Sequence, residues 1–229
     1  MGVTNPLFPE ESCSPLQITC REQAREEPSA RPNATALELA LVEFYNRTLA
    51  VPRRRDADDP VVLAGKGHFH QTGCVGCHTP RYETGPLVGS ALGEINGLFL
   101  DPEAEPREIE VLSRQTIWPY TDLLLHDMGG ECRAVTEETP GVWVQRCTGL
   151  ADGRPVFDAS GSEWRTPPLW GIGLTQTVNP RAGFLHDGRA RTVEEAILWH
   201  DGEARAAKEG FMALPRAARA ALLRFVESL

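Results

Sequence analysis

Apolar residues recur with a helical period in three stretches of the chain. The first stretch, TALELALVEFYNRTL, begins at Thr35 and is followed by Pro52 and three arginines. Its apolar residues fall at positions i, i+3, i+4 and i+7, which are Leu37, Ala40, Leu41 and Phe44. This spacing predicts a helix with one apolar face that ends before Pro52.

The other two periodic stretches lie in the last third of the chain. Thr192 and Glu195 form a T-x-x-E capping box at the start of one helix. In that helix Val193, Ala196, Ile197 and His200 share one side, so we expect His200 on a buried stripe. A final helix is predicted from Pro215, with Ala218, Leu222, Phe225, Val226 and Leu229 on one side.

A shorter helix is indicated by its start signals rather than by its period. Asp58 and Asp59 precede Pro60, and an acidic cap followed by proline is typical of a helix start. This helix leads directly into the run HQTGCVGCHTP. Residues 79–170 are mostly loop, and residues 1–34 show no sustained period and read as an extended arm. The expected fold class is mainly α, with long loops and a small β-hairpin.

The hairpin is predicted within ECRAVTEETPGVWVQRC, where Pro140 and Gly141 form a turn between β-prone runs. Its ends are Cys132 and Cys147, and a second close pair, Cys13 and Cys20, lies near the start. We expect two local disulfides and an oxidising compartment, with free buried thiols as the alternative. Closing the hairpin loop would contribute roughly 3 kcal/mol of stability in the chain-entropy model.

Composition limits the classes of protein that need to be considered. The 229 residues are 41% hydrophobic, which is enough for a core, and carry a net charge of −9. This charge argues against nucleic-acid binding and suits a basic partner protein. No run of about eighteen apolar residues and no signal peptide is visible in the sequence, so no membrane span is expected.

The chemistry is concentrated in CVGCH, which comprises Cys74, Cys77 and His78. A thioredoxin-like dithiol is disfavoured because no strand precedes the motif, and a zinc site lacks a second close pair, although His68 and His70 remain as ligands. In C-x-x-C-H each residue has a separate role, because the thiols bond the haem vinyl groups and the histidine reaches the iron. We therefore expect one covalently bound haem c.

The iron then needs a sixth ligand or keeps an open position. The candidate ligands that follow the motif are His126, Met128, His186, His200 and Met212. Each has an ordinary alternative: Met212 reads as core at a helix end, Met128 as a packing residue, and a histidine on an apolar stripe as a hydrogen-bonded core residue. A buried iron favours His200, since its imidazole faces inward.

Longer motifs extend this picture. The segments EWRTPPLWGIGLTQTV, GFLHDGRARTVEEAILWHDGEA, TIWPYTDLLLHDMG and LPRAARAALLRFVESL resemble the bacterial di-haem oxidoreductase family often labelled thiol oxidoreductase, which is related to di-haem cytochrome c peroxidases and MauG. The segments NPLFPEE, FYNRTLAVPRRRDADDP and GCVGCHTP resemble it too, so the resemblance covers nearly the whole chain. It implies a cytochrome c-like haem domain with His78 as proximal ligand.

The resemblance also assigns the distal side of the iron. In relatives the distal ligand follows an H-[DS]-G motif, here His186-Asp187-Gly188, and the matching position fourteen residues on is His200. Met128 is the runner-up, and a bis-histidine iron would have a lower potential than a His/Met iron. Arg189 and Arg191 are expected to contact haem propionates, or else to be exposed at a helix start, and Asp187 is expected to cap.

One departure from the family pattern shapes the functional hypothesis. Family members carry an N-terminal domain with another C-x-x-C-H motif, whereas this sequence contains one. We expect residues 1–34 to be the remnant of an interdomain segment, residues 35–229 to form a cytochrome c-like domain with one covalent haem, and the missing N-terminal haem domain to be a partner. The chain would then be the C-terminal half of a periplasmic protein, its export signal absent because of truncation. Calcium, found between the haems of related peroxidases, is not decided by this sequence.

Three functional hypotheses follow. The first is an electron relay that passes single electrons between a redox partner and the catalytic half. The second is a self-sufficient haem peroxidase with an open distal iron, assisted in proton transfer by His126 or Glu195. The third is a mainly partner-docking role for the arm and loops. A literal thiol oxidoreductase activity is disfavoured because thioether-bonded sulfurs do not exchange disulfides.

Overall fold

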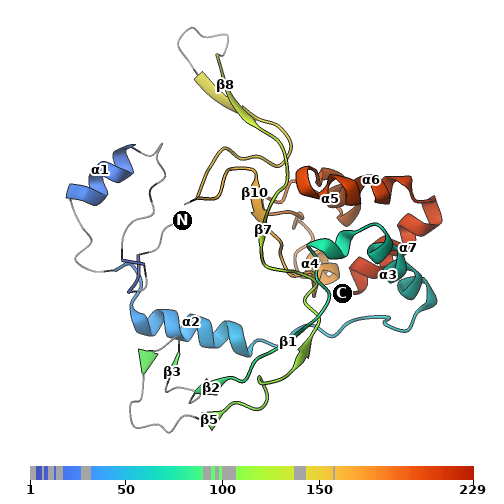
Figure 1. Ribbon diagram of the computed structural model, residues 1–229, viewed down its shortest axis with the longest axis horizontal. Helices are drawn as coiled ribbons and strands as arrows, with labels where there is room; N and C mark the ends of the chain where they lie inside the picture. The colour runs from blue at the N-terminus through green and yellow to red at the C-terminus, as the bar shows by residue number, and fades with distance from the viewer. Residues whose placement is uncertain are drawn as a thin grey trace. The chain divides into compact units, whose positions relative to one another are not determined.

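The computed structural model describes residues 4–6, 8–9, 13, 18–26, 32–89, 94–95, 98–99, 107–136, 143–156 and 158–229 (Figure 1). The chain divides into two compact units. The first unit comprises Met1–Ala50, Tyr82–Ile117 and Pro155–Asp158, and the second comprises Val51–Arg81, Trp118–Arg154 and Ala159–Leu229. Each unit is described by itself.

Most helices of the described chain belong to the second unit. The first unit holds α1 (Ile18–Glu26), which lies inside the predicted arm, and α2 (Ala36–Thr48). The second unit holds α3 (Pro60–Gln71), α4 (Thr175–Val178), α5 (Val193–Trp199), α6 (Arg205–Ala213) and α7 (Arg216–Ser228). It also holds the short 3-10 turns η1 (Cys74–Gly76), η2 (Ile172–Leu174) and η3 (Gly202–Ala204).

The described strands form small two-stranded antiparallel sheets. In the first unit β1 (Tyr82–Glu83) pairs with β6 (Thr116–Ile117), β2 (Val88–Gly89) with β5 (Arg107–Glu108), and β3 (Glu94–Ile95) with β4 (Leu98–Phe99). In the second unit β7 (Leu125–Asp127) pairs with β10 (Glu163–Arg165), and β8 (Cys132–Thr136) with β9 (Trp143–Cys147). The described structure is therefore mixed, with more sheet than the mainly α prediction anticipated.

Helix α2 begins where the sequence predicts. The Thr35 side chain accepts a hydrogen bond from the Glu38 amide, and the Glu38 carboxylate accepts one from the Thr35 amide, so the cap is reciprocal. Of its predicted apolar face only Ala40 is buried, whereas Leu37 and Leu41 remain about half exposed. The helix was predicted correctly, and the burial of its face only in part.

Helices α3 and α7 form the core of the second unit and pack side by side (Figure 1). The Asp59 carboxylate caps α3 by accepting from the amides of Val61 and Val62, as its sequence predicts. The two helices approach closely at Gly65, where a Cβ atom would lie 1.9 Å from the Ala221 carbonyl oxygen. The core between them contains Val62, Phe69, Leu222, Phe225 and Val226.

The predicted helix after Thr192 is present but shorter than its apolar period. The Thr192 hydroxyl accepts from the Glu195 amide, but the Glu195 carboxylate accepts from Arg191 instead of completing the capping box. Helix α5 ends at Trp199, and His200 is its C-cap with extended backbone. The prediction that His200 lies on a helical stripe is therefore wrong by one position, because the last hydrogen-bonded turn closes before it.

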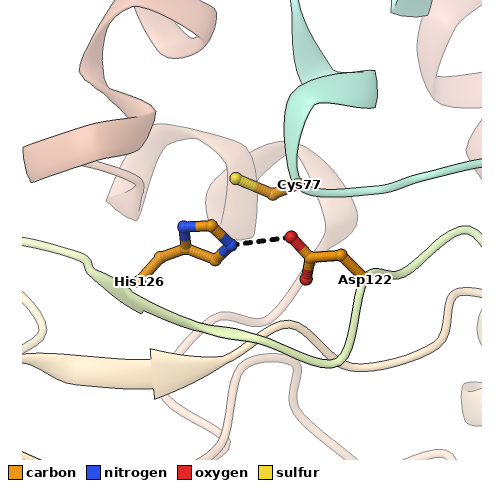
Figure 2. Close-up of side chains that lie close together, drawn as sticks. All are labelled: Cys77, Asp122 and His126. Carbon is orange, nitrogen blue, oxygen red and sulfur yellow. Dashed lines mark hydrogen bonds and ion pairs between the residues drawn. The ribbon is translucent and has the colours of Figure 1, made fainter.

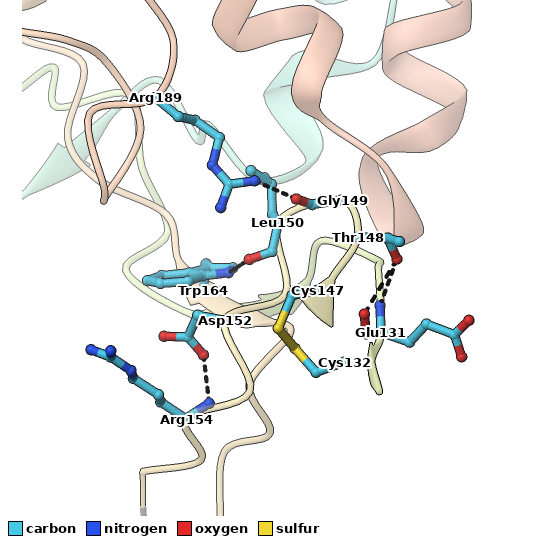
Figure 3. The surroundings of a disulfide bond; sticks show 10 residues. All are labelled: Glu131, Cys132, Cys147, Thr148, Gly149, Leu150, Asp152, Arg154, Trp164 and Arg189. Atoms are coloured by element: carbon cyan, nitrogen blue, oxygen red, sulfur yellow. Dashed lines mark hydrogen bonds between the residues drawn. A yellow bond between two sulfur atoms is a disulfide. The ribbon is translucent and has the colours of Figure 1, made fainter. Parts of the chain in front are cut away.

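Two disulfides are present, Cys13–Cys20 and Cys132–Cys147. The second joins directly opposed residues of β8 and β9 at the base of the predicted hairpin (Figure 3). The predicted turn at Pro140 and Gly141 lies outside the described residues. Among the described residues no helix has the length and apolar character needed to cross a membrane.

Candidate functional site

A cavity of about 330 Å³ lies in the second unit, and its walls are mainly apolar. Its volume is in the range of ordinary cofactor and ligand sites. Helices α3, α5, α6 and α7, the cysteine turn and the segment around Trp164 contribute side chains to it. The chemically active residues on its walls include Cys74, Cys77, His78, His126, Met128, His186 and His200.

The two motif cysteines are held by a short turn at the end of α3. Gly73 starts this turn with a left-handed backbone (φ 87°), and η1 then presents both cysteines to the cavity. Cys74 and Cys77 are free thiols, each partly buried. Burial raises the pKa of the Cys74 thiol, and burial together with the charges of Asp122 and Glu203 raises the pKa of Cys77. Both thiols are therefore neutral at pH 7.

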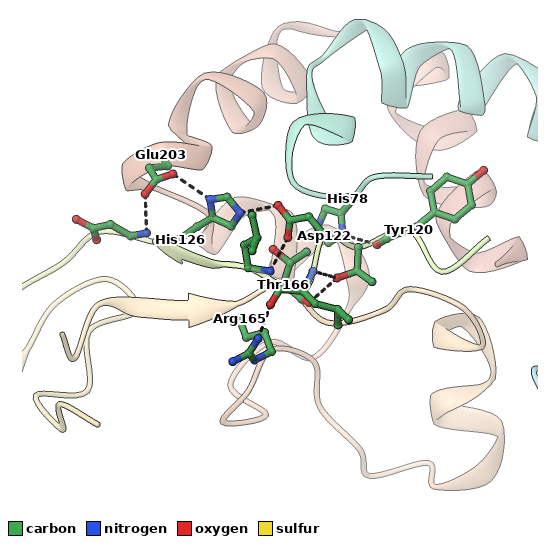
Figure 4. Close-up of polar contacts among 11 residues, drawn as sticks. His78, Tyr120, Asp122, His126, Arg165, Thr166 and Glu203 are labelled. Atoms are coloured by element: carbon green, nitrogen blue, oxygen red, sulfur yellow. Dashed lines mark hydrogen bonds and ion pairs between the residues drawn. The ribbon is translucent and has the colours of Figure 1, made fainter. Parts of the chain in front are cut away.

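His78 is oriented by a backbone carbonyl. Its Nδ1 lies 3.0 Å from the carbonyl oxygen of Tyr120, which can only accept, so Nδ1 carries the hydrogen (Figure 4). Burial lowers the pKa of His78 to about 4, so the ring is neutral. Nε2 then keeps a free lone pair on a residue that lines the cavity.

Tyr120 occupies an unusual backbone conformation at this contact. Its φ is 54°, a left-handed value that costs a non-glycine residue energy. The residue is 1% exposed, and its ring packs edge-on against Phe69 and Phe225. This packing holds the Tyr120 carbonyl against His78.

His200 shows the same arrangement on the cavity wall. Its Nδ1 donates to the carbonyl oxygen of Ala196 at 2.7 Å, which leaves Nε2 as the lone-pair nitrogen. Burial, and to a smaller extent the charge of Lys208, lowers the pKa of His200. Within the described residues no hydrogen bond reaches Nε2 of His200 or of His78.

These residues fit a covalently attached haem. Metal-ligating histidines commonly donate their second ring hydrogen to a carbonyl or carboxylate, and both His78 and His200 do so here. Two thiols stand in the same cavity as two neutral imidazoles, and the remaining lining is largely apolar. This donor set is the one that c-type attachment and axial ligation of iron require.

His126 is less suited to axial ligation of iron than His78 or His200, because both of its ring nitrogens are hydrogen-bonded to carboxylates. Its Nε2 lies 2.8 Å from the Asp122 carboxylate and its Nδ1 lies 2.9 Å from the Glu203 carboxylate (Figure 4). These contacts, chiefly the bond to Glu203, raise the pKa of His126. A ring that donates from both nitrogens becomes a metal ligand only after it releases one of these hydrogens, whereas His78 and His200 already have a free Nε2.

The remaining axial candidates differ in position. Met128 is partly buried and lines the cavity, so it keeps its place as runner-up. His186 lines the cavity too, but it stacks on Trp164 with ring centroids 4.9 Å apart and binds the Arg165 carbonyl through Nε2. Met212 lies at the end of α6, as expected, but its side chain is 54% exposed and is not core.

The two arginines that were expected to contact haem propionates make other contacts in the structure. Arg189 binds the Asp187 carboxylate and the Gly149 carbonyl, and Arg191 pairs with Glu195 with its side chain exposed. Neither arginine lines the cavity. Asp187 accepts from the Arg189 amide two residues on, which closes a turn, whereas the next helix, α5, is capped by Thr192, so Asp187 does not act as a helix cap here. The propionate contacts stay a prediction.

Several groups that shape the site could not be predicted from the sequence. The carbonyl of Tyr120 is one, because every residue has the same backbone acceptor and only tertiary packing selects this one. Ala196, four residues before His200, fits a helical register and was open to inference. The pairing of His126 with Asp122 and Glu203, and the cationic lining residues Arg165 and Lys208, depend on contacts between distant segments.

One family of known proteins matches the chain over its full length. The family model described as "Di-haem oxidoreductase, putative peroxidase" matches residues 1–229. No curated protein and no solved structure matches the chain. The match covers the whole sequence and names the cofactor that the cavity fits, so the chain belongs to the di-haem oxidoreductase family.

Proposed function

We propose that the cavity holds one haem c, bonded to Cys74 and Cys77, with its iron between His78 and His200. The protein would then transfer single electrons as one haem-bearing half of a di-haem oxidoreductase. The family supports the haem cofactor and the oxidoreductase role. The observation that carries the finer assignment is the matched pair of imidazoles, each with Nδ1 on a backbone carbonyl and Nε2 free toward one cavity.

The haem supplies the one-electron change of oxidation state, and the protein supplies the setting. The carbonyls of Tyr120 and Ala196 keep each ring hydrogen on Nδ1 and fix both ring planes. The apolar walls, among them Phe69, Leu222 and Val226, exclude water. An iron with two fixed imidazoles changes its coordination little on reduction, which suits electron transfer better than substrate binding.

The count of cysteines bears on the second haem of the family. The chain has six cysteines, and two disulfides use four of them, which leaves the pair at Cys74 and Cys77. A c-type haem needs two thioether bonds, so this sequence attaches one haem in that way. We propose that a further haem domain, the N-terminal domain of the family pattern, is the partner and that residues 35–229 adopt a cytochrome c-like arrangement. The disulfides favour the periplasm as compartment.

The test is the optical and electron paramagnetic resonance spectrum of the ferric protein, matured with haem-attachment machinery. We expect a low-spin, six-coordinate iron without a methionine-ligation band. His200→Ala should become high-spin while the mass still shows covalent haem, and Met128→Leu, the matched control, should keep the wild-type spectrum.

Other outcomes would change the assignment. A change in Met128→Leu with none in His200→Ala would move the distal ligand to Met128. A high-spin wild-type protein that reacts rapidly with peroxide would instead favour the self-sufficient peroxidase.

A further inference from the structure

A second group of metal-ligating atoms lies at the edge of the cavity. The sulfur of Cys77, a carboxylate oxygen of Asp122 and a ring nitrogen of His126 all lie within 4.8 Å of one another (Figure 2). Cys77 comes from the turn after α3, Asp122 from the segment that leads into β7, and His126 from β7 itself. All three side chains are partly buried, and Cys77 and His126 line the cavity.

The surroundings of His126 are those of a metal-ligating histidine. Glu203 binds Nδ1 at 2.9 Å and also accepts from the Asp127 amide at 3.0 Å, so its carboxylate is fixed on two sides. Nε2 then points at Asp122 and toward Cys77. A carboxylate on the far nitrogen fixes the ring and raises its basicity as a ligand, as in carboxylate–histidine–zinc arrangements.

The local charge favours a cation at this point. The carboxylates of Asp122 and Glu203 both contact the ring of His126 and place negative charge at this point. A divalent ion would offset this negative charge and bind Cys77 as its thiolate. Thiolate, imidazole and carboxylate are together a ligand set for zinc, with a fourth position open to water.

We propose that the haem-free chain binds one divalent transition-metal ion of the zinc type through Cys77, Asp122 and His126, with Glu203 orienting His126. Binding replaces the Asp122–His126 hydrogen bond and releases the thiol proton and the Nε2 hydrogen to solvent. The ion and the haem exclude one another, because one sulfur cannot be both a zinc-bound thiolate and a haem thioether. Only this exclusion rests on the proposed haem attachment.

Zinc binding to the reduced, haem-free full chain, measured by competition with a chromophoric chelator, tests the site. We expect one zinc per chain and a loss of affinity of about 100-fold in Cys77→Ser and about tenfold in Glu203→Gln. Cys74→Ser is the matched control, because it removes the neighbouring thiol, which lies outside the group, and should retain wild-type affinity.

Equal losses in Cys74→Ser and Cys77→Ser would show an ordinary dithiol site and overturn the proposal. Zinc affinity that stays unchanged in both Asp122→Asn and Glu203→Gln would also overturn the proposal, whether the haem-free chain is folded or not. Circular dichroism of each variant shows whether a loss of binding follows a loss of structure.

The competition is tested in cells that make the full chain together with haem-attachment machinery. Added zinc should lower the ratio of haem to protein in the wild type, and Asp122→Asn should be less sensitive. If added zinc lowers haem loading equally in the wild type and in Asp122→Asn, the proposed competition between zinc and haem is wrong, whereas the measured zinc affinity is unaffected. A spectrum without two histidine ligands would contradict the proposed function alone, because zinc affinity is measured without haem.

Discussion

At the scale of single residues, the site depends on hydrogen bonds that select one nitrogen of each imidazole. His78 and His200 are chemically alike before folding, and so is His126. The carbonyls of Tyr120 and Ala196 leave Nε2 free on the first two rings, whereas two carboxylates occupy both nitrogens of His126. One residue type thereby suits iron ligation in two places and forms part of an ion-paired cluster in the third.

The backbone carbonyl of Tyr120 accepts the hydrogen bond from His78, whereas its side-chain hydroxyl group takes no part in orienting the histidine. The hydroxyl oxygen is buried and has no hydrogen-bond partner among the residues that the structure describes. An unsatisfied buried polar group destabilises the folded state, so Tyr120→Phe should stabilise the protein by about 1 kcal/mol. Tyr120→Ala should destabilise it by about 3–5 kcal/mol because it leaves a cavity among Phe69 and Phe225.

Urea unfolding of the haem-loaded protein measures both variants. The ligation spectrum of Tyr120→Phe should equal that of the wild type, since the carbonyl of residue 120 is retained. A marked loss of stability in Tyr120→Phe would show that the hydroxyl group has a partner.

At the scale of elements, the pair α3 and α7 positions the site, because α3 delivers the cysteine turn and α7 forms part of the cavity wall. Gly65 sets the distance between the helices. Gly67, two residues on, has nothing within 4 Å of the place its Cβ would take and is exposed. The same substitution therefore has opposite consequences at these two positions.

Gly65→Ala should destabilise the protein by about 1–3 kcal/mol or more, because its Cβ would overlap the Ala221 carbonyl and push the helices apart. Gly67→Ala should stabilise α3 by about 0.5–1 kcal/mol, since alanine loses less entropy than glycine in a helix. Thermal unfolding of the pair checks both signs. Equal effects at the two positions would mean that helix propensity, and not the α3–α7 approach, controls stability here.

The elements also show which parts of the fold a sequence can predict. Helices α2, α3 and α7 were predicted because their caps and apolar periods act locally. A helix end was predicted at Met212, where α6 does end, but the buried residue there is Phe211 and the adjacent Met212 is exposed. His200 was predicted as the distal iron ligand and lines the cavity, yet the period does not reveal that the helix ends one residue before it. The Tyr120 carbonyl depends on packing between distant segments, which no local pattern encodes.

At the scale of the whole molecule, the disulfides affect the stability of the fold, and the net negative charge affects which redox partners approach it. The Cys132–Cys147 bond clamps the β8–β9 hairpin, which is separate in sequence from the cysteine turn and from His200.

The net charge of −9 acts over the entire surface. On the cavity walls, however, Arg165 and Lys208 add positive charge beside the carboxylates of Asp187 and Glu203. The net negative charge predicts faster electron exchange with cationic probes, whereas the positive charges near the cavity predict faster exchange with anionic probes.

Replacing both Cys132 and Cys147 by serine should lower the free energy of unfolding by roughly 3 kcal/mol, the loop-entropy contribution of this bond. The haem content and ligation spectrum should stay those of the wild type, because neither residue lines the cavity. Chemical unfolding and mass spectrometry measure the two quantities. A loss of covalent haem in this variant would show that the hairpin supports the site.

If the whole-molecule charge controls electron exchange, a cationic probe such as hexaammineruthenium should reduce or oxidise the haem faster than anionic hexacyanoferrate of matched driving force. The cationic rate should fall and the anionic rate rise with added salt, because the Debye length shrinks to about 8 Å at physiological ionic strength. The opposite ordering would mean that Arg165 and Lys208 dominate at the point of transfer. In that case Lys208→Gln should slow the anionic probe while leaving the iron ligation spectrum unchanged, and the natural partner would present acidic rather than basic groups to this face.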